Sequence, residues 1–149
     1  MLQPDPRTLT PGVIDRYAKR AFAYGACGAL AIVLHDTTGW PIVAITDSHN
    51  VYNGIAGGGS ALHWTVQRPD GFLVDIDGVH NVREMIDRYC DQADNGEAAA
   101  GLSTRADAYE WYVEAQEEPI PLTLARTFVA PLLAKIGKQT NFVQEQKYA

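Results

Sequence analysis

Three residues of this chain, Cys27, His63 and Asp75, have the types and the spacing that nucleophilic catalysis needs. Cys27 stands where a turn containing Gly25 passes into an apolar helical pattern. His63 opens a β-prone segment, and Asp75 lies in the next one. In this order a thiol, an imidazole and a carboxylate can act as nucleophile, base and orienting group.

The position of Cys27 at the start of a helix favours a reactive thiol. Free amides and the helix dipole at an N-terminus stabilise a thiolate, and a neighbouring imidazolium does so further. The backbone amide of Cys27 could also donate a hydrogen bond to an oxyanion. Free cysteine is, however, among the most buried residue types, so a packing role for Cys27 is the alternative.

A hairpin is expected to bring His63 and Asp75 together. The turn sequence Pro69-Asp70-Gly71 joins a strand over residues 62–67 to a return strand over 72–76. Asp75 and Asp77 share one face of the return strand, within cross-strand or diagonal reach of His63. We expect Asp75 to orient the imidazole and keep Asp77 as an alternate, although Asp77-Gly78 also suits a turn. A histidine at a solvated strand edge is the other interpretation of His63.

The remaining histidines give weaker alternatives. His35 lies about two turns along the expected helix from Cys27, His49 lies in a loop, and His80 precedes the helix cap Asn81 and is expected to be structural. A metal-dependent hydrolase is a third reading, but its ligands would not have the spacing typical of zinc sites. Neither a metal nor a cofactor is therefore expected. The residues of that metal hypothesis are His35, His49, His63 and Asp47.

These motifs resemble those of papain-like fold toxins and small cysteine hydrolases of bacteria and their phages. The resemblance covers residues 26–78 and rests on Cys27-Gly28-Ala29-Leu30-Ala31, His63-Trp64-Thr65-Val66 and a strand ending in Asp75-Ile76-Asp77-Gly78. It implies that Cys27 is the nucleophile, His63 the base and Asp75 the orienting residue. Papain has an upstream glutamine that helps to form the oxyanion hole, and residues 24–26 provide none here. Asn50 or Asn53 would have to replace it.

Periodicity and turn signals predict the elements that position these residues. The few strands cluster between helical segments, so we expect an α+β fold of the papain-like type. A small antiparallel sheet would pack against a buried N-terminal nucleophile helix and C-terminal helices. A first helix would begin at Pro11 after the cap Thr10 and bury Val13, Tyr17, Ala21 and Phe22. Further helices are expected over 27–36, 82–89, 106–115 and 122–136, strands over 40–46, 62–67 and 72–76, and loops over 47–60 and 91–101.

Length and charge limit the classes of function. The 149 residues predict one domain, with an extended arm over 1–10 and a loose tail over 138–149. The net charge of −6 argues against general binding to nucleic acid or to anionic membranes. The sequence shows no signal peptide and no apolar run long enough to span a bilayer, so a cytoplasmic location is expected. Cys27 and Cys90 are expected to be reduced thiols. The oligomeric state stays open.

Two functions are compatible with these observations. The first is a cysteine hydrolase or acyltransferase that acts on a peptide, isopeptide or side-chain amide through Cys27, His63 and Asp75. The second is a non-catalytic bacterial or phage protein that binds and inhibits a host protein, with its acidic charge suited to a basic target. In that case Cys27 would be a core residue, and an exposed apolar patch is expected near Tyr109, Trp111 and Tyr112.

Overall fold

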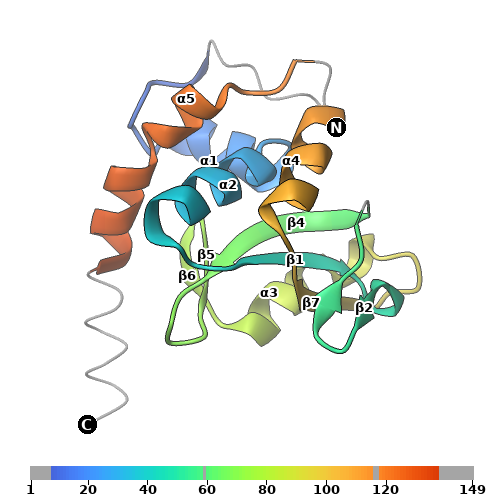
Figure 1. The fold of residues 1–149 in the computed structure, drawn as a ribbon. Coiled ribbons are helices and arrows are strands. Elements are labelled where there is room, and N and C mark those ends of the chain that lie inside the picture. The colour runs from blue at the N-terminus through green and yellow to red at the C-terminus, as the bar shows by residue number, and fades with distance from the viewer. Residues whose placement is uncertain (1–7, 59, 116–117, 138–149) are drawn as a thin grey trace, which may run out of the picture.

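The computed structural model describes residues 8–58, 60–115 and 118–137. They form the expected α+β fold, in which helices lie on both sides of a twisted sheet (Figure 1). Most of the predicted N-terminal arm and all of the predicted C-terminal tail fall outside the described residues. Within the described ranges no helix combines the length and the apolarity required to cross a bilayer.

The sheet is larger than expected and is mixed. Seven strands lie in the order β2-β3-β7-β1-β4-β5-β6. Neighbouring strands are antiparallel except for β3 and β7, which are parallel, so the prediction of a small antiparallel sheet is only partly correct. The strands are β1 (Ile42–Asp47), β2 (Val51–Tyr52), β3 (Ile55–Ala56), β4 (Ala61–Gln67), β5 (Leu73–Asp75), β6 (Gly78–His80) and β7 (Ala98–Leu102).

The helices divide unequally between the two faces of the sheet. In Figure 1, α1, α2, α4 and α5 lie on one side and α3 lies on the other. The helices are α1 (Arg16–Tyr24), α2 (Cys27–Thr38), α3 (Val82–Tyr89), α4 (Arg105–Glu114) and α5 (Leu122–Arg126), followed by helical residues 129–137 and supplemented by the short 3₁₀ helices Ser48–Asn50 and Cys90–Gln92. The cap predicted for α3 is present, because the Asn81 side chain accepts a hydrogen bond from the Arg83 amide.

Two hydrophobic cores result from this arrangement. Every residue of β1 is buried, and successive side chains point to opposite faces. Ile42 and Ala44 join the larger core, which contains the continuous buried stretch of α2 from Cys27 to Leu34. Val43 and Ile45 join the smaller core, which contains Met85 and Tyr89 of α3. Helix α2 is apolar nearly all round because sheet and helices enclose it.

The first helix begins later than predicted. It starts at Arg16, where the Asp15 carboxylate accepts hydrogen bonds from the amides of Tyr17 and Ala18 and thereby caps the helix. Gly12 has a φ of 77°, which interrupts a helix that would begin at Pro11. The predicted buried face is therefore wrong in part: Val13 and Tyr17 are exposed, whereas Ala21 and Phe22 are buried as expected.

Two further expectations about loops and helix ends are corrected. The predicted loop over 91–101 contains most of β7, which pairs with β1 in the middle of the sheet. The predicted loop over 47–60 contains the short strands β2 and β3. The predicted continuous helix over 122–136 is interrupted at Thr127, whose hydroxyl donates to the Leu124 carbonyl and accepts from the Gly12 amide. This competition with the helical backbone explains the break.

Candidate active site

Cys27 is the first residue of α2. The preceding N-cap residue is Ala26, which provides no side-chain acceptor for the first-turn amides. A helix that starts without a side-chain cap keeps amide donors and the positive end of its dipole beside its first residues. The Cys27 side chain is only 2% exposed and belongs to the larger core. The sequence prediction of a cysteine at a helix start is thus confirmed, and so is its burial.

His63 and Asp75 form a buried hydrogen-bonded pair. Nε2 of His63 lies 2.9 Å from Oδ2 of Asp75, and neither side chain is appreciably exposed. The register of β4 and β5 places Val66 opposite Val74, so that Asp75 is diagonal to His63. The imidazole also stacks on the ring of Tyr89, the last residue of α3, with centroids 4.8 Å apart. The hairpin therefore places the two residues within reach of each other, as the sequence predicts.

A second histidine shares the carboxylate of Asp75. Nε2 of His80 lies 2.7 Å from Oδ1 of Asp75, and the same oxygen accepts a hydrogen bond from the Asp77 amide. The sequence predicts a structural role for His80 beside the cap Asn81 and does not predict this contact. The available signal is the pair Asp77-Gly78, whose residue types favour a turn. The turn itself is Ile76-Asp77, and it pairs Leu73 with His80 on the face of Asp75.

The protonation of the pair follows from these contacts. Burial by itself raises the pKa of the Asp75 carboxyl, but hydrogen bonds from His63 and His80 outweigh burial and hold this pKa well below its ordinary value. Burial lowers the pKa of His63, but its hydrogen bond with Asp75 and the nearby Cys27 thiol outweigh that effect and raise this pKa to about 9. At neutral pH the pair is therefore an imidazolium and a carboxylate.

The Cys27 thiol raises the pKa of the His63 ring, although no hydrogen bond of ordinary geometry joins the two side chains. Nδ1 of His63 is fully buried and makes no hydrogen bond, while the thiol contributes to the raised pKa of the ring. Because Nε2 is engaged by Asp75, Nδ1 is the ring atom left for an interaction with Cys27. The geometry thus brings a thiol, an imidazole and a carboxylate into one buried cluster.

The pairing of β4 leaves His63 with a neighbouring strand on one side only, where it pairs with Ile45 of β1. Strand β5 pairs with β4 at Val66 and Gln67, so His63 lies beyond the end of this ladder. The imidazole stacks on Tyr89, which belongs to the smaller core, and its pKa is raised by the thiol of Cys27, which belongs to the larger core.

The two alternate residues occupy other positions. The carboxylate of Asp77 is partly exposed and lies 4.0 Å from Arg88 rather than beside His63. The amide nitrogen of Asn50 donates to Thr46 Oγ1, to the Gly57 carbonyl and to Ser60 Oγ. These bonds close the loop between β1 and β4, so Asn50 holds this loop and has no free donor for an oxyanion. Asn53 has a φ of 53° in the β2–β3 turn.

The residues of the metal hypothesis do not form one cluster. Asp47 and His49 meet Asp94, with ligand atoms within 4.8 Å of one another. His63 is bonded to Asp75, and Nδ1 of His35 is 2.8 Å from the Trp40 carbonyl oxygen. The buried Asp47 already accepts a hydrogen bond from the Asp94 amide. The Asp47–His49–Asp94 group is the only described set of three such residues close enough to share an ion.

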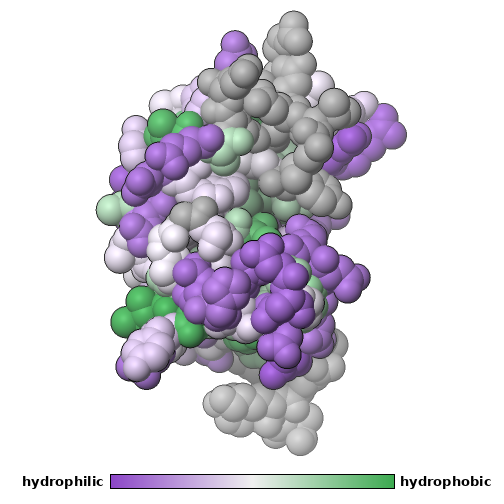
Figure 2. All heavy atoms as spheres, turned by 90° about the vertical axis from the view of Figure 1, so that its right-hand side faces the viewer, coloured by the Kyte–Doolittle hydropathy of each residue, from purple (hydrophilic) through white to green (hydrophobic). Residues whose placement is uncertain are grey.

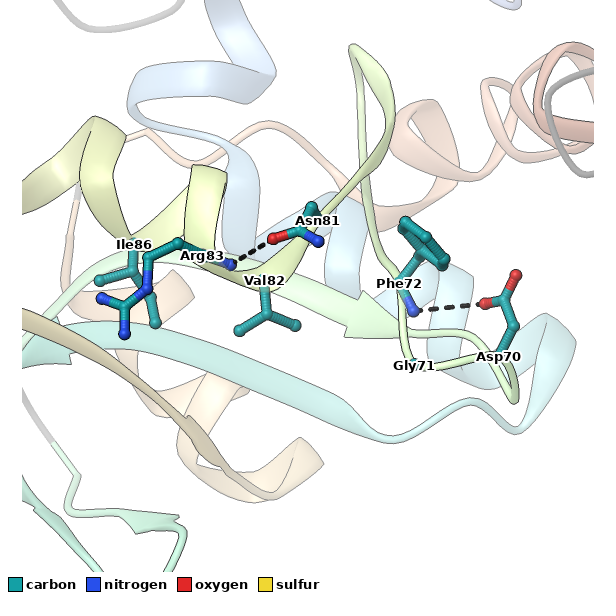
Figure 3. Close-up of a pocket in the computed structure, with 7 residues that line it drawn as sticks. All are labelled: Asp70, Gly71, Phe72, Asn81, Val82, Arg83 and Ile86. Carbon is teal, nitrogen blue, oxygen red and sulfur yellow. Dashed lines mark hydrogen bonds between the residues drawn. The ribbon is translucent and has the colours of Figure 1, made fainter. Parts of the chain in front are cut away.

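A cavity lies beside the elements that hold the site but does not include its residues. It has a volume of about 430 Å³ and lies between the turn at Asp70 and the start of α3 (Figure 3). Val82 and Ile86 provide apolar walls, and Arg83 and Asp70 provide opposite charges. A second cavity of about 320 Å³ is lined by residues that include Trp40 and Arg68. Neither cavity opens directly on Cys27.

Comparison with known proteins adds no assignment. No protein-family model, no curated protein and no solved structure matches this chain.

Proposed function

We propose that this protein is a papain-like cysteine hydrolase or acyltransferase that acts on a peptide, an isopeptide or a side-chain amide. One observation carries the proposal: Asp75 holds Nε2 of His63, while Nδ1 is buried without a hydrogen bond and the Cys27 thiol acts on the same ring. An imidazolium whose second N–H lacks an acceptor is best neutralised by a thiolate. The uncapped start of α2 favours the same charge state of Cys27.

The proposed reaction assigns one role to each residue. The Cys27 thiolate attacks the carbonyl carbon, and the backbone amides at the start of α2 stabilise the oxyanion. The imidazolium of His63 gives its proton to the leaving amine as the C–N bond breaks, which leaves a thioester on Cys27. Neutral His63 then takes a proton from water or from an acceptor amine, which attacks the thioester and restores the thiolate. Asp75 keeps the imidazole oriented in both steps.

Access to the thiol requires a movement in the helical layer. Trp111 of α4 packs on Gly28, so closely that a Cβ at Gly28 would lie 3.0 Å from the Trp111 ring. Trp111 also approaches Trp64 of β4, with ring centroids 6.0 Å apart. Cys27 itself is only 2% exposed, so a substrate reaches its thiol only after the packing around the start of α2 has rearranged, and Trp111 beside Gly28 is part of that packing.

The charge of Cys27 tests the proposal directly. We expect the ultraviolet absorbance of a thiolate at neutral pH in a Cys90→Ser protein, and its loss in Cys90→Ser/His63→Gln. An activated thiol is ionised where an ordinary thiol is mostly protonated. Absorbance requires no reagent access, so burial of Cys27 does not disturb the measurement. The rate of alkylation of Cys27 by iodoacetamide should fall in parallel in the His63→Gln variant.

The control is the Cys27→Ser protein, in which the half-buried Cys90 is the remaining thiol. It should give no thiolate signal at neutral pH. A Cys27 that stays a neutral thiol, or whose charge is indifferent to His63, would make it a core residue and would refute the enzyme.

A non-catalytic interaction protein is the second candidate, and an exposed apolar row favours it. Tyr52, Ile55 and Leu102 are 81%, 60% and 45% exposed and occupy paired positions across β2, β3 and β7. Figure 2 shows hydrophobic side chains over this hairpin, at the lower left of the view. At the position expected for the patch, Tyr109 is exposed, but Trp111 and Tyr112 pack on the larger core. Binding to a protein target that Tyr52→Ser/Ile55→Ser abolishes and Cys27→Ser leaves intact would establish this function.

A further inference from the structure

The carboxylate of Asp75 is bonded to an imidazole at each oxygen. Oδ2 accepts from His63 at 2.9 Å, and Oδ1 accepts from His80 at 2.7 Å. An ionised carboxylate can only accept, so both ring Nε2 atoms act as donors. The shorter of the two contacts belongs to the histidine that the reaction does not use.

We propose that His80 is a positioning residue that holds Asp75 in line with His63 and so keeps Nδ1 of His63 available to Cys27. The inference rests on the proposed function, in which Asp75 orients His63. His80 does not touch the reacting atoms and acts through Asp75 alone.

The burial of Asp75 explains why a second donor is needed. Its side chain is 5% exposed, and a buried carboxylate must have its lone pairs satisfied by donors. Without His80, the oxygen Oδ1 would keep only the backbone amide of Asp77, which lies in the adjacent turn. Rotation of the carboxylate about its χ2 torsion is then opposed by fewer contacts, and the bond to His63 loses its fixed direction.

Strand pairing positions His80 as well as Asp75. His80 is the last residue of β6, in register with Leu73 of β5, and α3 begins after the cap Asn81. The same helix ends at Tyr89, which stacks on His63. One continuous segment, residues 78–89, thus supports the catalytic imidazole from two directions: through the carboxylate and through the ring face.

Two substitutions distinguish the role of the His80 N–H donor from the role of its ring. His80→Phe keeps a ring but removes the donor, and His80→Gln keeps an N–H at a similar distance from the backbone. We expect His80→Phe to lower the rate of Cys27 alkylation about tenfold, the effect of one lost hydrogen bond to a charged group. His80→Gln should restore the rate to within about twofold. The matched control is His49→Phe. His49 is an exposed histidine in the 3₁₀ helix Ser48–Asn50, and its substitution should leave the rate unchanged.

A double-mutant cycle tests whether His80 acts through Asp75. In an Asp75→Asn background, His80→Phe should have no further effect on the alkylation rate, because the group that it positions is already lost. An unchanged rate in His80→Phe alone, or an equal loss in both backgrounds, would overturn the proposal. Should His80→Phe fail to fold, His80→Asn, whose shorter amide does not reach Oδ1, takes its place.

The Nε2 proton of His63 distinguishes this inference from the proposed function. In proton NMR a histidine N–H bonded to a carboxylate gives a resolved downfield signal that exchanges slowly when the bond is held. In His80→Phe this signal should broaden through faster exchange, and in His80→Gln it should persist. A neutral Cys27 would refute the enzyme and leave this readout valid, whereas an unaltered signal in His80→Phe would refute the positioning role alone.

Discussion

The carboxylate of Asp75 determines the charge of the whole site. It is the buried anion that keeps His63 protonated at neutral pH, and it is satisfied by His63, by His80 and by one backbone amide. A charge in such a place is stabilised only while its partners stay in position. A neutral isostere should therefore disturb the site more than its similar size suggests.

Asp75→Asn tests this dependence at the level of one residue. The amide NH₂ would face an imidazole N–H in place of an acceptor, and we expect a loss of about 3 kcal/mol in the free energy of unfolding at pH 7. The Cys27 thiolate should disappear in the same variant. Urea denaturation and thiolate absorbance measure the two effects.

The control is Asp77→Asn, two residues along the chain and partly exposed. It should change the unfolding free energy by less than about 0.5 kcal/mol. Equal stability of Asp75→Asn and the unmodified protein would show that the two imidazoles do not depend on this carboxylate.

The sequence predicts the proximity of His63 and Asp75 because it depends only on the turn at Pro69-Asp70-Gly71 and on the alternation of strand side chains between the two faces of the sheet. The contact of His80 depends on a second turn, at Ile76-Asp77, whose two-residue length is not evident before the strand β5 is known to end at Asp75. The fully engaged amide of Asn50 could not be foreseen either, since its partners Gly57 and Ser60 are brought back by the loop.

Among the elements, β7 shows most clearly how context decides structure. Its sequence, Ala98-Ala99-Ala100-Gly101-Leu102, has little intrinsic preference for a strand. It becomes one because small side chains fit between β1 and β3, where Gly101 comes close to Ala56. The strands predicted over 40–46 and 62–67 correspond to β1 (Ile42–Asp47) and β4 (Ala61–Gln67) to within two residues, because their β-branched and aromatic residues favour the same state locally.

Gly101→Ala tests this close packing. A Cβ at Gly101 would lie 2.7 Å from the backbone nitrogen of Ala56, and the backbone cannot yield as a flexible side chain can. We expect a loss of about 2 kcal/mol in the free energy of unfolding, measured by urea denaturation, because β3 must separate from β7.

The same substitution at Gly137 is the control. Gly137 is helical, and a Cβ there would meet no atom within 4 Å. Gly137→Ala should leave stability unchanged or raise it by up to about 1 kcal/mol. A Gly101→Ala protein as stable as Gly137→Ala would contradict the proposed fit between the two strands.

The raised pKa of His63 makes the stability of the whole molecule depend on pH. The ordinary value is 6.5, and the Asp75 bond and the Cys27 thiol outweigh burial to raise it to about 9 in the folded protein. Folding therefore favours the protonated ring. Its contribution is fully present below pH 6.5 and is lost as the pH rises through 9, by about 3 kcal/mol in all.

Denaturation by urea across this range measures the effect. The test uses a Cys27→Ala background, because a thiolate at Cys27 would contribute with the opposite sign over the same pH range. In this background the unfolding free energy should fall as the pH rises above 6.5, and adding His63→Gln should flatten the curve. If the unfolding free energies of the two proteins changed with pH in parallel, the pKa of His63 would not be raised by folding.

The position of β7 in the sheet has a consequence for the order of folding. The hairpin β2–β3 follows β1 in the chain, yet β7 lies between β1 and β3. Nearest-neighbour strands β4, β5 and β6 can pair through short loop closures, whereas β7 must return from a distant part of the chain. We therefore expect the sheet to grow outward from β1 and the β4–β5–β6 meander, with the β2–β3 hairpin docking last. During synthesis we expect this hairpin to leave the ribosome before its partner strand, because β3 pairs with Leu102 of β7.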